Sequence, residues 1–154
     1  KECGNGKKCG MDITVINKQG VIRIDKKSIK KSAKIFLRSL RHRKNSILNV
    51  IFVSPAEIRK INIKYFNKNK TTDVIALAAG KFGKARDIYY NYLGDIIICP
   101  QTAKRNCAIF GTSLKKELLL YTVHGILHLV GWDDLNKKDS AKMSKKQEEL
   151  LDLL

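Results

Sequence analysis

The feature that most constrains this chain is an apolar run at residues 118–130 that contains two histidines, His124 and His128. A spacing of four residues places both imidazole rings on the same face of an α-helix. A helix this apolar is buried, and each buried ring nitrogen then needs a hydrogen-bond partner or a metal ion to offset the loss of water. The pattern predicts a long buried helix whose histidines either share a metal ion or form a hydrogen-bonded core pair.

The residues that follow this helix favour the metal-binding interpretation. Gly131 can adopt the left-handed conformation that ends a helix and lets the chain fold back. Asp134, or alternatively Asp133, would then supply a carboxylate as a third ligand and leave one position open for water. Glu117 and Tyr121 precede the histidines on the same helical face, so we expect them to contact and orient the ligands.

Residues 124–134 read H-G-I-L-H-L-V-G-W-D-D, which resembles the signature H-G-x-L-H-L-x-G-Y-D-H of the YbeY family of metal-dependent endoribonucleases. The resemblance extends to residues 65–74 and to residues 93–98, where L-G-D-I-I-I is similar to the family's L-G-D-I-x-I strand. Three single positions also agree with the family pattern, namely Glu117, Met143 and Glu148.

The resemblance implies a single-strand endoribonuclease that acts in ribosomal RNA maturation or ribosome quality control, with ribosomal RNA and the small ribosomal subunit as partners. It also implies one divalent metal ion, with zinc as the first choice and iron, nickel or manganese as alternatives. The expected metal ligands are His124, His128 and Asp134. The same three residues are the expected catalytic residues, together with Asp133, which would orient a ligand or the attacking water.

The chain departs from the family pattern at three places. Asp134 stands where the family has a third histidine, and two histidines with one carboxylate form a recurring ligand set. Phe66 stands where the family has an arginine tied to RNA cleavage, and residues 76–78 replace L-S-F-P-like residues. Because phenylalanine cannot pair with a phosphate as a guanidinium does, we expect neighbouring cations to supply the positive charge. The expected RNA-binding cations are Arg59, Lys64, Lys68 and Lys70. Trp132 is the fifth expected RNA-binding residue, because its ring can stack on a base.

Two other functions stay open. A non-catalytic RNA-binding or ribosome-binding protein would keep the metal only for stability, a case that Phe66 strengthens. Independently of this choice, Trp132 could be a packed residue rather than a base-stacking one. A metalloprotease-like hydrolase is the weaker alternative, because Gly125 occupies the position where H-E-x-x-H enzymes carry their glutamate general base.

The charge of the chain points to a polyanionic partner. The 31 Lys and Arg residues outnumber the 14 Asp and Glu residues, which gives a formal net charge of +17. Such an excess favours binding to nucleic acid through phosphate contacts. Since the lysines are spread along the chain, a lysine-rich proteome is the alternative explanation.

No apolar run is long enough for a membrane helix, and the first residues lack the apolar core of a signal peptide, so we expect no membrane association and a cytoplasmic location. In that reducing compartment the four cysteines would be free thiols, namely Cys3, Cys9, Cys99 and Cys107.

The order of elements predicts one α/β (α+β) domain at residues 11–154, with a single mixed sheet packed by several helices and the metal site at the end of the histidine helix. A disordered leader is expected at residues 1–10. Strands are expected at residues 13–16, 21–24, 48–53, 74–78 and 96–99, and a connection or hairpin at 80–91. Helices are expected at residues 27–41, 58–66 and 100–108, and Ser54 with Pro55 and Glu57 is expected to cap the second of these. Two more are expected, one from a cap at Thr112 or Ser113 through the histidines and one from Asn136 or Asp139 to about residue 153.

Overall fold

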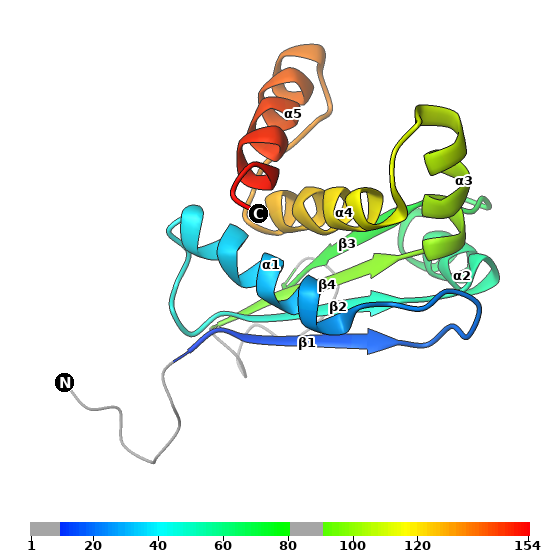
Figure 1. Cartoon of the computed structure of the whole chain (residues 1–154), viewed down its shortest axis with the longest axis horizontal. Coiled ribbons are helices and arrows are strands. Elements are labelled where there is room, and N and C mark those ends of the chain that lie inside the picture. Colours follow the sequence, from blue (N-terminus) through cyan, green and yellow to red (C-terminus); the bar gives the residue numbers. More distant parts are fainter. Residues whose placement is uncertain (1–9, 81–90) are drawn as a thin grey trace.

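A four-stranded sheet is covered on both faces by helices in the computed structural model, which describes residues 10–80 and 91–154 (Figure 1). The strands are β1 (Asp12–Asn17), β2 (Ile47–Phe52), β3 (Val74–Ala78) and β4 (Tyr92–Ile98). The helices are α1 (Lys26–Ser39), α2 (Pro55–Phe66), α3 (Pro100–Phe110), α4 (Leu114–Leu129) and α5 (Lys137–Leu151). This arrangement confirms the predicted α+β class with one mixed sheet.

The strand order is β1-β2-β4-β3. Strands β1, β2 and β4 are parallel, whereas β3 pairs antiparallel with β4 and forms one edge of the sheet. A parallel neighbour needs a crossover connection, which α1 supplies between β1 and β2. The edge position of β3 matters for the site, because α4 packs against this strand while all its side chains except that of Ile75 stay partly exposed.

Residues alternate between the two faces of the sheet, as strand geometry requires. In β4, Ile96 and Ile98 belong to the larger core cluster under α1 and α4, whereas Ile97 packs with Ile58 of α2 in the smaller cluster on the opposite face. Helix α5 lies on the outer side of α4 (Figure 1) and adds Met143 to the larger cluster. The histidine helix is therefore held between the sheet and α5.

Gly125 allows α4 to pack closely on the sheet. A Cβ atom at this position would lie only 2.6 Å from Cγ2 of Ile96, which is a steric clash. A larger side chain would force α4 away from β4 and would move both neighbouring histidines with it.

Side-chain caps fix the starts of four helices, and Asp25 is the cap of α1. The Ser54 side chain accepts a hydrogen bond from the backbone N–H of Glu57 at 3.2 Å, as expected for α2. For α4 the cap is Ser113 rather than Thr112, and for α5 it is Asn136 rather than Asp139. Both caps were among the alternatives that the sequence offered.

The strand predicted at residues 21–24 is wrong, because this segment forms a loop around the side chain of Gln19. The Oε1 atom of Gln19 accepts hydrogen bonds from the backbone N–H groups of Val21 and Ile22 at 3.0 and 2.9 Å. Its Nε2 group donates to the carbonyl oxygen of Ile22 at 2.7 Å. One side chain thus pairs with the backbone groups that a strand would need for its ladder.

Some sequence predictions fall outside the described residues. These concern the leader up to residue 9, with Cys3 and Cys9, and nearly all of the connection predicted at residues 80–91. Within the described ranges, Cys99 and Cys107 are free thiols as predicted. The helices of residues 10–80 and 91–154 include none with the length and apolar character needed to cross a membrane.

Candidate metal centre

The C-terminal end of α4 carries both histidines of the motif. Their side chains are half-buried, with 28% of His124 and 29% of His128 exposed. The two Nε2 atoms lie 3.0 Å apart, and the rings meet edge to face. The predicted helical spacing therefore brings the two imidazoles into direct contact at the surface of the helix that faces the edge of the sheet.

The chain after α4 folds back through a tight helix end. Gly131 has a φ of +100°, which glycine adopts more readily than any other residue. Its N–H donates to the carbonyl oxygen of His128 at 3.1 Å, and the N–H of Trp132 donates to that of Leu127 at 2.9 Å. These two bonds form a Schellman motif. The chain therefore reverses at Gly131, as its sequence predicted.

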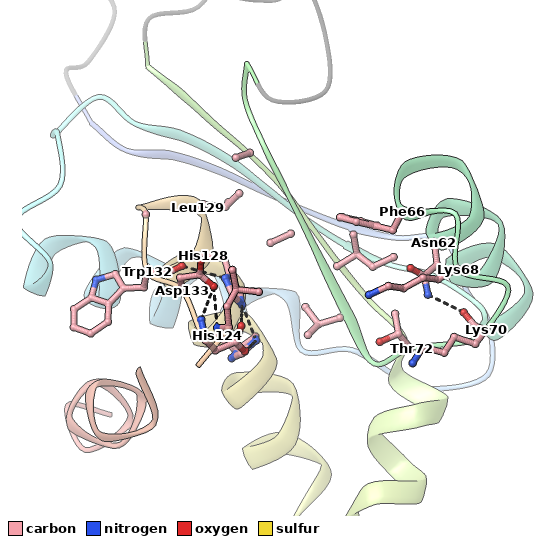
Figure 2. A pocket seen from close by; sticks show the side chains of 17 residues that line it. Asn62, Phe66, Lys68, Lys70, Thr72, His124, His128, Leu129, Trp132 and Asp133 are labelled. Atoms are coloured by element: carbon pink, nitrogen blue, oxygen red, sulfur yellow. Dashed lines mark hydrogen bonds and ion pairs between the residues drawn. The ribbon is translucent and has the colours of Figure 1, made fainter. Parts of the chain in front are cut away.

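This reversal places the carboxylate of Asp134 against the histidines. Its Oδ2 lies 3.8 Å from Nε2 of His124, and its Oδ1 lies 3.8 Å from Nε2 of His128. One ligand atom from each of the three residues lies within 4.8 Å of the other two. The three side chains therefore form a group that can hold a metal ion (Figure 2).

The hydrogen bonds of the Nδ1 atoms orient the rings of the two histidines. Nδ1 of His124 lies 2.6 Å from Oε1 of Gln147 in α5, and Nδ1 of His128 lies 3.1 Å from the backbone carbonyl oxygen of Trp132. Both partners are acceptors, so each Nδ1 acts as the donor, and in its neutral form each ring directs the lone pair of Nε2 toward the other ring.

A divalent cation suits this arrangement. Two lone pairs that face each other at 3.0 Å repel, and a proton between them would turn one ring into a cation. Burial lowers the pKa of His128, and the nearby His124 lowers it further, so the charged form of this ring is disfavoured. A metal ion bound to both Nε2 atoms and to Asp134 would remove the repulsion, and the His, His, carboxylate set matches known ligand chemistry.

Asp133 has a different position from Asp134. Its Oδ1 accepts hydrogen bonds from the N–H groups of Asp134 and Leu135 at 2.7 and 3.1 Å. Asp133 therefore holds the turn that presents Asp134, and it lies outside the three-residue group, although it lines the adjacent cleft.

The prediction that Glu117 and Tyr121 orient the histidines is wrong. Oε1 of Glu117 accepts a hydrogen bond from the hydroxyl of Thr112, and the hydroxyl of Tyr121 accepts one from Asn106 of α3. Burial raises the pKa of Tyr121 to about 12. Both side chains lie nearer the start of α4 than the histidines do, so Glu117 bonds to the segment just before α4 and Tyr121 joins α4 to α3.

Gln147 is the orienting residue that the sequence prediction missed. It lies four residues after Met143 and three before Leu150, the two buried apolar side chains of α5. A polar residue on the buried face of an amphipathic helix was the available signal, but nothing in the sequence indicated which partner it would meet.

The metal-binding group lies at one end of a cleft of about 580 Å³ that follows the edge strand β3. Lys68 and Lys70 line the opposite end of the cleft, on the other side of β3 from the two histidines (Figure 2). Phe66 and Trp132 line it as well, and Trp132 also packs against the larger core cluster. The cleft therefore joins three of the five residues expected to bind RNA to the metal-binding group.

The other two predicted RNA-binding residues do not line this cleft. Nε of Arg59 donates to Oδ1 of Asn69 at 2.7 Å, and Nζ of Lys64 lies 5.2 Å from the ring centroid of Tyr65. Both side chains belong to α2, which covers the opposite face of the sheet.

Comparisons with known proteins agree with this fold. Residues 14–154 match the family described as Endoribonuclease YbeY. The Endoribonuclease YbeY of Staphylococcus carnosus is 41% identical over 109 residues, which cover 68% of this chain and 70% of that relative. The corresponding protein of Syntrophus aciditrophicus is 32% identical over 146 residues, or 94% of this chain and 90% of the relative.

A solved structure has a similar fold. The solution structure of TM1509 from Thermotoga maritima covers 90% of this chain and 86% of its own, with a TM-score of 0.58 and 27% sequence identity. Because the family model matches residues 14–154, this chain belongs to the YbeY endoribonuclease family.

Proposed function

We propose that this protein is a metal-dependent endoribonuclease that cuts single-stranded segments of ribosomal RNA during maturation or quality control of the small ribosomal subunit. The observation that carries the proposal is the convergence of His124, His128 and Asp134 at one end of a cleft whose other end has two lysines. Family membership supports RNA as the substrate class, since its relatives are named endoribonucleases. The cytoplasm is the compartment in which we expect this substrate.

Zinc is the metal we propose first, with iron, nickel or manganese as alternatives, because imidazole and carboxylate ligands accept all four. Bound by these three ligands, the ion would lower the pKa of a water molecule and polarise a phosphodiester oxygen.

The chain's own residues have separate roles in this proposal. Lys68 and Lys70 attract the phosphates of the strand that enters the cleft, and Trp132 supplies an aromatic ring on which an unpaired base can stack. Asp133 positions Asp134 through the two backbone hydrogen bonds of the turn. A cleft of about 580 Å³ is in the size range of small-ligand pockets, so an unpaired strand fits better than a double helix.

Arg59 and Lys64, which lie outside the cleft, contribute to the positive field that draws RNA toward the protein. Their effect would then depend strongly on salt, whereas contacts inside the cleft would depend on it less.

A metalloprotease-like activity has less support, because Gly125 is buried against Ile96 and provides no general base. A non-catalytic RNA-binding protein has one observation in its favour. Phe66, at the cleft wall, leaves no guanidinium at the place where the family has its arginine.

The first prediction separates these functions by substrate. Incubation with structured ribosomal RNA should give cuts in unpaired segments that disappear on chelation and return with added zinc, and casein should stay intact. Gel analysis of both substrates measures this. Binding of RNA without any cut at any of the four metals would favour the non-catalytic protein, and casein cleavage would favour the protease.

The second prediction concerns the third ligand. Asp134→Ala should lose zinc during dialysis, Asp134→His should keep it, and Asp133→Ala should keep it with some loss of stability, because the turn loses its side-chain acceptor. Metal content by elemental analysis and thermal unfolding measure the two effects. Zinc retained by Asp134→Ala and lost by Asp133→Ala would reverse the assignment.

The third prediction concerns Gln147. Without its acceptor, the ring of His124 can change tautomer and rotate, so Gln147→Leu should weaken zinc binding by about 10- to 100-fold. Gln147→Glu should keep the affinity or raise it, because a carboxylate accepts the same Nδ1–H bond.

Two measurements check this role. Competition with a zinc indicator gives the affinity, and nitrogen NMR of the histidine rings gives the tautomer in the metal-free protein. Lys145→Leu, an exposed polar-to-apolar change on the same helix, serves as the control. An Nδ1-protonated His124 and unchanged affinity in Gln147→Leu would remove Gln147 from the site.

The fourth prediction concerns the missing arginine. Phe66→Arg should raise the rate of RNA cleavage about tenfold or more, because one well-placed donor to the developing phosphate charge is worth about 100-fold or more. Phe66→Gln, which is polar but uncharged, should give no such gain. Equal rates for all three proteins would assign the phosphate contact to Lys68 or Lys70 instead.

A further inference from the structure

Helix α1 and the turn after it form the most one-sidedly charged part of the described chain. Residues 26–44 contain nine Lys and Arg residues and neither Asp nor Glu. The apolar side of α1 is buried, with Phe36 and Leu37 fully inside the larger core cluster against β1 and α4. The cations must therefore share the outward side of the helix.

These cations form a continuous stripe. At helical spacing, one face of α1 presents Lys27, Lys30, Lys31, Lys34 and Arg38, and Arg41 follows just after the helix. All are exposed except Lys34, which is half-buried. A helix of 14 residues is about 21 Å long at the standard rise, so the stripe is an extended rod of positive charge.

Within residues 10–80 and 91–154, the cations of α1 have no acidic ion-pair partner. Among the described residues, the ion pairs that involve lysine both lie in α5, where Lys142 pairs with Asp139 at 3.6 Å and Lys146 with Glu149 at 3.0 Å. Asp25, at the start of α1, uses its carboxylate to accept a hydrogen bond from the N–H of Ser28. The stripe differs in this respect from Lys142 and Lys146 of α5, which each have an acidic partner on the same helix.

Two features of the stripe define its partner. A basic amphipathic helix can bind an anionic membrane only if its apolar face is free to enter the lipid, and in α1 that face is packed on the protein. The stripe also has no aromatic side chain to stack on unpaired bases, so it can recognise only regularly placed negative charge. The phosphate backbone of a nucleic acid helix meets both conditions.

We propose that the α1 stripe docks the sugar–phosphate backbone of a double-helical segment of RNA, while an unpaired segment of the same molecule enters the cleft. This inference rests on the proposed function for its choice of RNA. Helix α4 lies between the two surfaces, because it contacts α1 on one side and the edge strand β3 on the other (Figure 1). An RNA must therefore be longer than the strand that fills the cleft to contact both.

The test compares two variants with the same net charge. The first replaces four stripe residues by glutamine, Lys27→Gln, Lys30→Gln, Lys31→Gln and Arg38→Gln. The matched control replaces four exposed lysines of α5, Lys137→Gln, Lys138→Gln, Lys142→Gln and Lys145→Gln. Circular dichroism and thermal unfolding establish that both proteins fold.

Binding is measured with chelator present, so that no cleavage occurs, on an RNA duplex with a single-stranded overhang and on a short single-stranded RNA. The stripe variant should bind the duplex RNA about tenfold or more weakly near physiological salt, and the slope of log affinity against log salt should fall by about 3. Its affinity for the short RNA should change less than twofold, and the α5 control should stay close to the unchanged protein on both.

Equal losses in the two variants would mean that net charge alone determines binding, which would overturn the proposal. Loss of binding to phosphatidylserine vesicles in the stripe variant, with duplex RNA binding unchanged, would assign the stripe to a membrane surface and would also overturn it. Because binding is measured without metal, a protein that binds as predicted but cuts no RNA would refute the proposed nuclease function and leave the stripe assignment intact.

Discussion

The interaction on which this structure depends is the approach of the His124 and His128 imidazoles, whose Nε2 atoms lie 3.0 Å apart and direct their lone pairs at each other whenever both rings are neutral. Neither ring can turn away, because Gln147 and the Trp132 carbonyl hold the opposite nitrogens. Such an arrangement is unfavourable by itself and becomes favourable with a cation at the point of convergence. The metal-binding interpretation thus follows from the hydrogen bonds around the histidines as much as from the motif.

The rest of the fold sets the position of those two rings. Gly125 brings α4 close to Ile96, so the helix cannot roll without a steric clash. The Schellman motif at Gly131 returns the chain to the histidines, and Asp133 fixes the turn that carries the carboxylate of Asp134. Helix α5 adds the acceptor for His124. Three separate pieces of local structure therefore converge on one small volume, which is the preorganisation that a ligand site needs.

The sequence predicted best those features that depend on local chemistry. The helix caps at Ser54 and Ser113, the chain reversal at Gly131 and the contact between His124 and His128 all involve residues within a few positions of each other. It failed where distant or unusual partners decide the outcome. The segment after Gln19 has strand-forming residues, yet one glutamine side chain takes its backbone hydrogen bonds. Glu117 and Tyr121 share a helical face with the histidines, but their partners are Thr112, just before α4, and Asn106 of α3. Gln147 is remote from the motif in sequence and needs the packing of α5 to reach it.

X-ray absorption of the zinc-loaded protein tests the central claim most directly, because it reports the atoms bound to the metal without any assay of activity. Our account predicts a shell of nitrogen and oxygen neighbours at about 2.0–2.1 Å, with the outer scattering of two imidazole rings. A sulfur shell at about 2.3 Å, or the scattering of a single ring, would contradict it.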